Sequence, residues 1–479
     1  MTGLSHPPAS PNGPSSHTSS KESKDLTNPL AGRRTASRRT FLGAGAALGA
    51  AVPLLATGAV PAAADQRDKR LARGTSAPQQ SARAAFSFLQ QVTDAYATSG
   101  RRLAQSYDDA RLADTGFVYD NALTCMALLA AGDWTRARAI GDALLHAQQR
   151  DEAGDGRLRQ AYHVRSFVDQ SAAPVAGWEY GFTGTAVGDM AWTAIALAQL
   201  ARRTEQSSYR RGLLRIAHWI VDNARSSTGL GGFTFGETAG LEDHKSTEHN
   251  IDLVALFRLV AQLTGDRSWL AHAEHALGFV DAVWNDEDGF FWTGSDDGAT
   301  VNKAATQLPL DVQTWYWLAV GERNRRRCLD WARTNLATTD TPLRRNSALQ
   351  GSYAVSGVGF SSGTLMTDVT TKVAGKDWNP RPDDGGVWME GTAQLALALH
   401  ARDGDGDRER FEELMGQLRS TQDRLGAGQL FHGRRTTGGI VAASSPLDTG
   451  FGFDYSQNLH VGATSWYLFA AMRFNPFRF

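Results

Sequence analysis

Acidic residues recur where apolar helical segments of this chain are expected to begin. The first five such segments open with a carboxyl group and the sixth with a histidine, namely Asp120, Asp189, Asp252, Asp311, Glu390 and His460. A helix N-terminus stabilises a carboxylate and Asp is a favoured capping residue, so capping alone explains any one of them. Five carboxyl groups around one rim are harder to explain in that way. Carboxyl groups held close together can act as a general acid and a general base, which is the chemistry that we expect here.

The densest polar cluster of the chain is the segment HKSTEHNID. Glu248 and Asp252 are four residues apart, so on a helix they share one face. His249 could bind a hydroxyl group or move a proton. A metal site is disfavoured, because the HExxH spacing is absent and the adjacent Glu248 and His249 point in different directions on a helix. The simpler alternative is that Ser246 or Thr247 caps the helix, with Glu248 in its first turn.

Aromatic residues accompany these carboxyl groups along the same segments. Trp178 and Tyr180 flank Glu179 in a glycine-rich loop, where core packing is a poor explanation for them. Flat rings with polar edges, set beside carboxylates, are what a cleft offers to the apolar faces of sugar rings. Trp192 and Trp315 lie further into their helices, where core packing alone could explain them.

Six apolar, Ala-rich segments are expected to position these residues as buried helices, because they are hydrophobic on nearly every face. Most are followed, after a polar or glycine-containing turn, by a charged amphipathic segment such as YRRGLLRIAHWIVDNA or RERFEELMGQLRS. Glycine–aromatic stretches such as GLGGFTFGE and DEDGFFWTG lead to the next apolar segment and favour short hairpins. The pattern predicts six inner helices, each paired with an outer one, in a closed ring.

In this arrangement the sequence resembles the (α/α)6-toroid, or six-hairpin, superfamily of secreted carbohydrate-active enzymes, over residues from about 85 to 479. The resemblance implies an all-α fold, an (α/α)6 toroid of six helical hairpins with short β-hairpin-like loops on one face. The inner helices would run in the same direction, so that their N-termini share one mouth. An open α-solenoid is the alternative fold; against it, the last helix is as apolar as the middle ones and has no polar cap.

The resemblance also implies a glycoside hydrolase that acts on an oligo- or polysaccharide with a pair of carboxyl groups. Relatives mostly invert the anomeric configuration, which requires carboxyl groups roughly 6.5–9.5 Å apart. The candidates for the acid are Glu248 and Glu390, and those for the base are Asp189, Asp252 and Asp311.

The apolar setting of Glu390, which follows Trp388 and Met389, should raise its pKa toward that of a general acid. We expect neither a metal nor a cofactor. The expected substrate-binding residues are Asp120, Trp178, Glu179, Tyr180, His249, Trp315, Trp388, Tyr455 and His460.

Two other functions compete with hydrolysis. A polysaccharide lyase or sugar epimerase abstracts a proton next to a carboxylate or carbonyl group and uses Arg or Lys to neutralise the acid. The expected rim is rich in carboxyl groups and poor in Arg, apart from Arg381 and Lys245, which suits a neutral glycan better than an acidic one. A glycan-binding protein without catalysis is the other alternative, because a fold does not guarantee an activity.

The first 64 residues are expected to lie outside the folded body. They comprise a segment rich in Ser, Pro and Thr, followed by SRRTFL at residues 37–42, which resembles a twin-arginine export motif. The apolar run that follows is interrupted by Pro53 and Pro61, which disfavours a membrane anchor, and small residues precede a cleavage site near Ala64–Asp65. We expect a secreted protein, with a linker at 65–84 and a catalytic domain at 85–479.

The charge balance excludes a nucleic-acid-binding protein. The 479 residues include 49 Lys+Arg and 50 Asp+Glu, whereas neutralising phosphates requires an excess of cations. Residues 65–479 alone carry a net charge of −5. The two cysteines, Cys125 and Cys328, exclude a disulfide scaffold and are expected to be unpaired.

Overall fold

The computed structural model describes residues 76–97, 100–175, 183–366, 371–373, 376–379 and 381–479. The predicted export signal and its cleavage site lie outside these residues. Within them, two sets of six helices alternate along the chain. The inner helices are α3 (Val118–Ala130), α5 (Val187–Thr204), α7 (Thr247–Thr264), α9 (Leu310–Ala319), α11 (Met389–Arg402) and α13 (Val461–Met472). The outer helices are α2 (Ala77–Thr93), α4 (Trp134–Arg150), α6 (Ser207–Ala224), α8 (Trp269–Ala282), α10 (Arg327–Asn335) and α12 (Asp407–Thr421).

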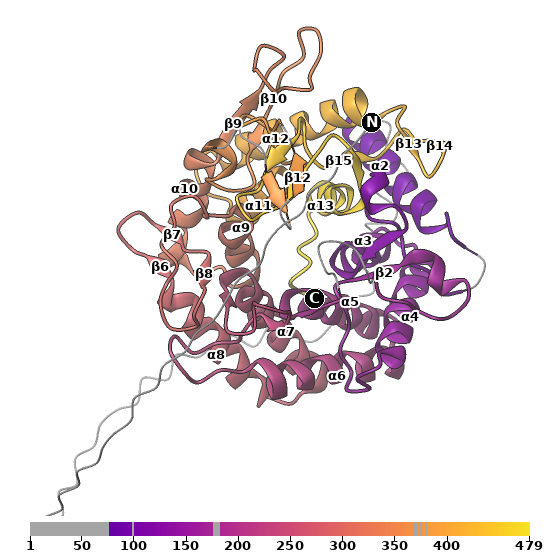
Figure 1. Ribbon diagram of the computed structural model, residues 1–479, viewed down its shortest axis with the longest axis vertical. Coiled ribbons are helices and arrows are strands. Elements are labelled where there is room, and N and C mark those ends of the chain that lie inside the picture. The colour runs from indigo at the N-terminus through magenta and orange to yellow at the C-terminus, as the bar shows by residue number, and fades with distance from the viewer. Residues whose placement is uncertain (1–75, 98–99, 176–182, 367–370, 374–375, 380) are drawn as a thin grey trace, which may run out of the picture. The chain divides into compact units, whose positions relative to one another are not determined.

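The inner helices form a closed ring. Each packs against the next in chain order, and α13 packs against α3, which returns the ring to its start (Figure 1). Because the terminal inner helix meets the first, the predicted (α/α)6 toroid is confirmed and an open solenoid is excluded. The sixth outer helix is α2, which comes from the N-terminal side and packs against α13. It begins at Ala77, so the helical part of the chain starts within the predicted linker 65–84.

Burial separates the two layers as the sequence predicts. The inner helix α5 buries residues on all sides, including Met190, Trp192 and Ile195. The outer helix α6 buries one stripe, which includes Leu213 and Ile216, and its remaining face is open to solvent. Side chains of both layers join one continuous apolar core, which is the main source of stability for such a ring. No helix among the described residues is long and apolar enough to cross a membrane.

Extended residues precede every inner helix and pair with a neighbouring loop. Four of these pairs are short antiparallel ladders: β1 (Thr115–Phe117) with β2 (Ala161–His163), β3 (Thr185–Ala186) with β4 (Gly236–Glu237), β5 (Lys245–Ser246) with β8 (Gly294–Ser295), and β18 (Leu459–His460) with β15 (Ile440–Val441). Before α9 and α11 the pairing is a single bridge, Pro309 to Ser361 and Trp388 to Ala443. His460 also bridges to Tyr107, which closes the series around the ring. Each inner helix therefore starts from a fixed point.

The remaining strands form local hairpins. They are β6 (Trp284–Asn285) with β7 (Phe290–Phe291), β9 (Ala337–Asp340) with β10 (Val355–Val358), β11 (Thr371–Val373) with β12 (Lys376–Asn379), β13 (Leu430–Phe431) with β14 (Arg434–Arg435), and β16 (Leu447–Asp448) with β17 (Asp454–Tyr455). The glycine–aromatic stretches of the sequence thus fall partly in hairpins and partly in the ladders that anchor the inner helices.

Side chains at the fourth residue of the inner helices secure the same anchor points. Asn250 of α7 accepts a hydrogen bond from the Phe233 backbone N–H at 2.9 Å and donates to the Phe233 carbonyl at 3.0 Å. Asn121 of α3 and Gln313 of α9 make the same paired contact with the backbone of Ala104 and Phe291. These side chains satisfy buried backbone groups next to the inner helices.

The C-terminal segment closes the centre of the ring at the far end from the inner-helix N-termini. Asn475 and Arg478 donate to the Leu318 carbonyl near the end of α9, and Gln199 of α5 donates to the Arg478 carbonyl. Phe477 packs against Trp192, with ring centroids 4.8 Å apart. The C-terminus accordingly lies in the middle of the ring in Figure 1, so the ring has one open end.

We predict that Asn250→Ala destabilises the protein by about 3 kcal/mol, because it leaves the buried Phe233 N–H and carbonyl without partners. Denaturant unfolding followed by circular dichroism measures this. Asn223→Ala is the matched control: Asn223 is exposed on α6 and bonds only the Trp219 carbonyl, so its loss should change stability by less than about 0.5 kcal/mol. Equal losses in the two variants would contradict the anchoring role.

Candidate active site

The first turns of the inner helices supply one set of side chains at the open end of the ring. The second residues of the six helices, in ring order, are Tyr119, Gly188, Glu248, Asp311, Glu390 and Gly462. The third residues of α3, α5 and α7 are Asp120, Asp189 and His249. Apart from Gly462, all of these line a cavity of about 470 Å³. The structure therefore brings Asp120, Asp189, Glu248, Asp311 and Glu390 together, as the sequence predicts.

Asp252 lies one turn deeper in its helix than the sequence predicts. Helix α7 begins at Thr247 rather than near Asn250, so Asp252 is its sixth residue and Glu248 is the acidic residue of its first turn. Ser246 is the N-cap and its hydroxyl accepts a hydrogen bond from the His249 N–H, which confirms the capping alternative. The expectation that Asp252 opens this helix is wrong. It does not line the cavity, it is fully buried, and neither carboxyl oxygen has a hydrogen-bond partner.

The floor of the cavity comes from this sixth-residue layer. Trp192, Trp315 and Trp466 occupy the same helix position as Asp252, and Trp192 and Trp315 contact each other edge to face at 5.0 Å. Phe477 of the C-terminal segment packs beneath both rings. The site is thus a pocket with an aromatic floor, and Trp315 takes part in both the core and the site.

Glu390 has an asymmetric set of hydrogen bonds. Its Oε1 accepts a hydrogen bond from the Tyr119 hydroxyl at 2.6 Å and one from the Gln394 side-chain amide at 3.3 Å. The Trp466 indole N–H donates to the same Tyr119 hydroxyl at 2.9 Å, which fixes its direction. Oε2 is buried and has no hydrogen-bond partner. Burial raises the pKa of Glu390 to about 7.

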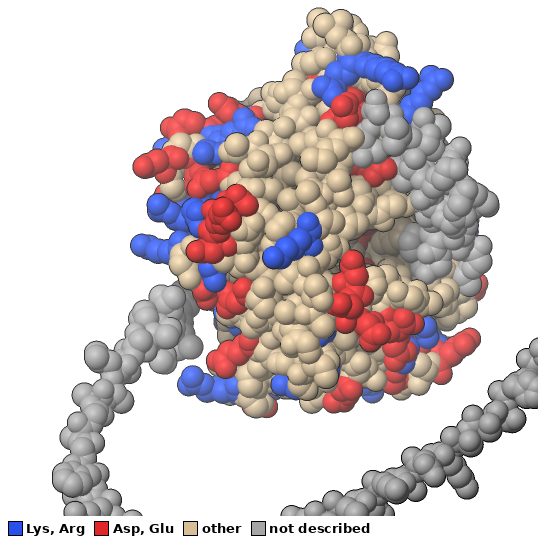
Figure 2. All heavy atoms as spheres, turned by 60° about the vertical axis from the view of Figure 1, so that its left-hand side comes forward, with Lys and Arg blue, Asp and Glu red and all other residues tan. Residues whose placement is uncertain are grey.

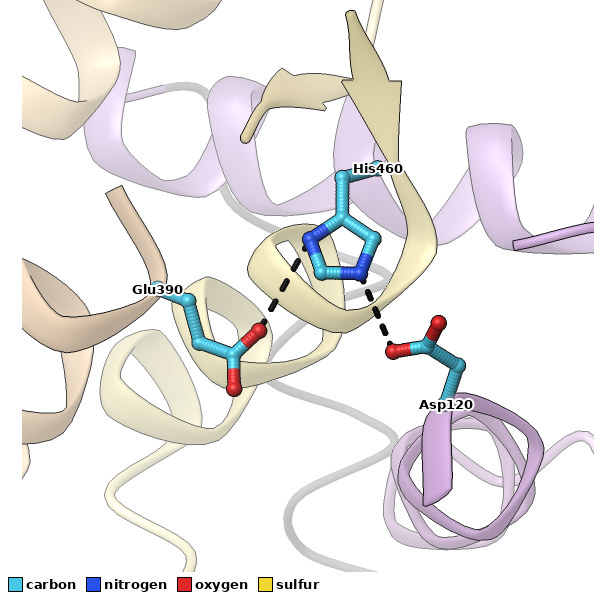
Figure 3. A group of neighbouring side chains, drawn as sticks. All are labelled: Asp120, Glu390 and His460. Carbon is cyan, nitrogen blue, oxygen red and sulfur yellow. Dashed lines mark hydrogen bonds and ion pairs between the residues drawn. The ribbon is translucent and has the colours of Figure 1, made fainter. Parts of the chain in front are cut away.

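His460 lies between two carboxyl groups (Figure 3). Its Nε2 is 3.0 Å from Asp120 Oδ1, and its Nδ1 is 3.7 Å from Glu390 Oε2. Nδ1 also accepts the Ala463 backbone N–H as the N-cap of α13, so we place the proton of the neutral imidazole on Nε2, which donates it to Asp120. The Tyr107 ring stacks on the imidazole at 4.1 Å and 9° and fixes its plane.

A metal ion is a second use for these three residues, because ligand atoms of Asp120, Glu390 and His460 lie within 4.8 Å of one another. The two carboxyl groups, however, face opposite nitrogens of one imidazole ring. A single ion bonded to one nitrogen would leave the other carboxyl group on the far side of the ring. The geometry therefore favours an imidazole that is hydrogen-bonded to Asp120 and lies beside Glu390 over a metal centre.

Crowding and burial perturb the other carboxyl groups as well. Burial raises the pKa values of Asp189 and Asp311 to about 7. Burial, followed by the charges of Asp311, Asp189 and Glu390, holds the pKa of Glu248 well above its usual range. His249 is expected to remain neutral, because burial lowers its pKa to about 4. Perturbed carboxyl groups in a concave site are typical of catalytic centres.

Two glycines make room for these groups at the second helix position. A Cβ on Gly462 would lie 2.5 Å from Asp120 Oδ1 and 2.7 Å from His460 Cε1. A Cβ on Gly188 would collide with the imidazole of His249. Any larger residue at either position would displace a polar side chain of the site.

Aromatic side chains form one wall of the cavity. Trp388 and Tyr455 stack at 6.0 Å and 19°, and Phe360 and Phe453 lie against Tyr455. The predicted residues Trp388, Tyr455, Asp120, His249 and Trp315 all line the cavity. His460 does not line it but contacts two residues that do, Asp120 and Glu390. The candidates Trp178, Glu179 and Tyr180 lie outside the described residues.

Sequence reasoning missed three functional side chains. Tyr107, Tyr119 and Gln394 orient His460 or Glu390, and none of them belongs to an acidic pattern. The one available signal was position: Tyr119 directly precedes Asp120, as Gly188 precedes Asp189, at the start of an apolar helix.

Comparison with known proteins supports the fold. No protein-family model and no curated protein matches the sequence. Among solved structures, a glycosidase variant in complex with glucose matches with a TM-score of 0.55 and 13% identity, over 86% of this chain and 98% of that one. A second glycosidase variant matches with a TM-score of 0.54 and 12% identity, over 86% and 98%. A novel alpha-amylase from Clostridium perfringens matches with a TM-score of 0.50 and 11% identity, over 83% and 98%. The chain has the fold of these glycosidases.

We predict that the free energy of unfolding of Asp252→Asn, relative to that of the natural chain, is higher at pH 8 than at pH 4. Burial and the neighbouring Glu248 carboxyl hold the pKa of Asp252 well above its usual range. The folded state therefore keeps a proton that the unfolded state loses above about pH 4, and the free energy of unfolding falls as pH rises. Asparagine cannot ionise and removes that loss.

Denaturant unfolding of both proteins at the two pH values measures the difference, which should change in favour of the variant between pH 4 and pH 8. Asp222→Asn on the exposed face of α6 is the control. A difference between natural and variant protein that is the same at both pH values would refute the prediction.

Proposed function

We propose that the protein is a glycoside hydrolase that cleaves its substrate with two carboxyl groups of the pocket. The observation that carries the proposal is the free Oε2 of Glu390. All fixed hydrogen bonds to this carboxyl group fall on Oε1, so Oε2 is the oxygen that can hold a proton and give it to a leaving group. A pKa of about 7 keeps a substantial fraction of Glu390 protonated near neutral pH.

Glu390 is the general acid in this proposal and Asp189 the general base. An inverting hydrolase activates water on the face of the sugar opposite the acid. In the ring order α3, α5, α7, α9, α11, α13, helix α5 lies opposite α11, so Asp189 faces Glu390 across the pocket. The order of helices thus favours this pair over Asp311, which is on a helix next to that of Glu390. Glu248 and Asp311 bind substrate in this scheme.

Asp120, His460 and Tyr119 are positioning residues in this scheme. Tyr119 holds Oε1, and His460, which Asp120 and the Ala463 N–H hold in place, lies next to Oε2. The stacked Tyr107 ring keeps the imidazole edge directed at both carboxyl groups.

The lyase and epimerase alternative is less favoured by the lining of the pocket. Those reactions need a cation to neutralise the substrate carboxylate. Arg111 is the one Arg or Lys among the described lining residues, and it forms ion pairs with Asp109 and Asp454. A carbohydrate-binding protein without turnover remains the second candidate, and the same experiment distinguishes it.

We predict that Glu390→Gln lowers kcat by about 10²–10⁴-fold, because the amide keeps the hydrogen bonds to Oε1 but cannot transfer a proton. Reducing-sugar release from a panel of α- and β-linked glycans measures activity, and NMR of the first product formed gives the anomer. Asp189→Asn should lose activity to a similar extent.

Gln417→Glu, at an outer-helix position away from the pocket, is the control and should keep full activity. Full activity in both pocket variants would refute the catalytic pair. A product that retains its anomeric configuration would refute inversion but leave hydrolysis standing. An absorbance rise from an unsaturated sugar would favour the lyase.

Export is the second part of the proposal. The Arg38–Arg39 pair, the mild apolar run after it and the small residues before Asp65 support twin-arginine secretion of the folded protein. Replacing both arginines by lysine should leave the protein inside the cell with its signal uncleaved, as immunoblots of cell and medium fractions would show. Unchanged secretion of that variant would rule out this route.

A further inference from the structure

Two phenylalanine side chains at the rim of the pocket are exposed to solvent. Phe451 and Phe453 are 37% and 39% exposed, both lie on the turn between β16 and β17, and Phe453 lines the cavity itself. A large apolar side chain left in water forgoes the free energy that its burial would give. Single exposed apolar residues are normal on a protein surface, but a pair on one turn beside a cavity indicates a contact with a ligand.

The turn that carries the two rings is fixed to the neighbouring loops. The Thr449 hydroxyl donates a hydrogen bond to the Phe453 carbonyl at 2.7 Å, and the Thr449 carbonyl accepts one from the Ser361 hydroxyl at 2.6 Å. Gly450 has a φ of 83°, and a Cβ on it would lie 2.9 Å from the Thr306 carbonyl oxygen. Hydrogen bonds and close backbone packing thus hold the exposed rings at one place on the rim.

The exposed rings are the outer end of a continuous row of aromatic side chains, which we call the aromatic ridge. Phe453 contacts Tyr455 edge to face with ring centroids 5.7 Å apart, and Tyr455 stacks on Trp388 at 6.0 Å. Phe451 contacts Phe360 edge to face at 6.0 Å, and the Phe360 ring lies 4.5 Å from that of Trp388. Exposure falls from 39% at Phe453 to 2% at Trp388, so the ridge leads from solvent to the wall of the pocket.

The aromatic ridge begins on the side of the pocket that carries the proposed general acid. Trp388 is the N-cap of α11, Glu390 is the second residue of that helix, and both side chains line the cavity. A general acid must reach the glycosidic oxygen, which departs with the leaving group. Asp189, the proposed base, is on α5, on the opposite side of the ring. The ridge therefore extends outward from the position of the leaving group and not from that of the attacking water.

The side chains of the rim indicate what kind of group the ridge contacts. The rings of Phe451 and Phe453 have no hydrogen-bonding group and offer only a flat apolar surface, which suits stacking. Arg111, the one Arg or Lys of the described lining, already pairs with Asp109 and Asp454. On the face of the molecule shown in Figure 2, acidic and basic side chains are mixed over most of the area, which gives no reason to expect a charged leaving group. The complementary group is flat and uncharged.

We propose that Phe451 and Phe453 bind the leaving group of the substrate by stacking on a flat apolar face, that of a sugar ring or of an aryl aglycone. The proposal rests on the proposed hydrolase function and adds the substrate class to it. The substrate is a glycoside whose leaving group carries a ring, while the sugar on the other side of the bond occupies the pocket. A glycoside with a small leaving group, such as a methyl glycoside, would enter the pocket but leave the ridge uncovered.

The test compares leaving groups on the same sugar, with methyl glycosides, phenyl glycosides and disaccharides of D-glucose and of D-mannose in both anomeric configurations. Phe453→Ala should lower kcat/KM for phenyl glycosides or disaccharides by about 3- to 10-fold through loss of stacking. The double variant Phe451→Ala/Phe453→Ala should lose more, and methyl glycosides should change by less than about twofold in either. Because each substrate is compared with itself across the variants, the intrinsic reactivity of the leaving groups cancels.

Phe479→Ala is the matched control. Phe479 is 38% exposed, like the two rim residues, but it is the last residue of the segment that closes the far end of the ring. This variant should leave kcat/KM unchanged for every substrate, and circular dichroism checks that all variants keep their fold. A loss confined to phenyl glycosides or to disaccharides supports the proposal and identifies the leaving group. Equal losses on methyl and ring-bearing substrates, or no loss on either, would overturn it.

Calorimetric binding of the same glycosides separates this proposal from the hydrolase function. Binding that depends on Phe451 and Phe453, without cleavage of any glycoside by the natural protein, overturns the hydrolase and keeps the ridge as a ligand site. Cleavage that does not depend on the two rings overturns the role of the ridge and leaves the hydrolase intact. Neither binding nor cleavage overturns both.

Discussion

The antiparallel pairing of the residues just before each inner helix is the constraint on which the site depends. It fixes where all six helices begin, through ladders such as β1–β2 and β5–β8 and through the bridges at Pro309 and Trp388. Side chains at the second and third helix positions then converge on one mouth, because their helices start at equivalent points and run in one direction. The fold thereby places these side chains around the pocket without any long loop to carry them.

Equivalent positions at the starts of the inner helices carry different types of side chain. At the second position, Glu248, Asp311 and Glu390 present carboxyl groups, while Gly188 and Gly462 present none. The glycines are needed because the third-position Asp120 and His249 and the capping His460 occupy the space that a side chain would fill. Six equivalent helix starts thus form an asymmetric site. Three helices carry a carboxyl group at the second position, and two carry a glycine that leaves space for a polar side chain nearby.

The architecture could be predicted from the sequence, because inner and outer helices differ in hydrophobic pattern, and that pattern is a property of each segment alone. The acidic rim could be predicted as well, since Asp120, Asp189, Asp311 and Glu390 stand at the helix starts. The start of α7 could be predicted only as one of two alternatives, near Asn250 or after a cap at Ser246 or Thr247, because residues 244–249 are nearly all polar. The structure has the second alternative, which places Glu248 in the first turn and Asp252 one turn deeper. Tyr119, Tyr107 and Gln394 were also out of reach, because their roles arise from contacts between helices far apart in the chain.

The site works against the stability of the ring that holds it. Burial and the charges of Asp311, Asp189 and Glu390 raise the pKa of Glu248. Asp252, one turn below, adds a further buried acid without a hydrogen-bond partner. Removing any one of them would relieve repulsion, so their presence is not explained by folding. The core and the tail that closes the far end, with Phe477 against the tryptophan floor, supply the stability that permits this crowding.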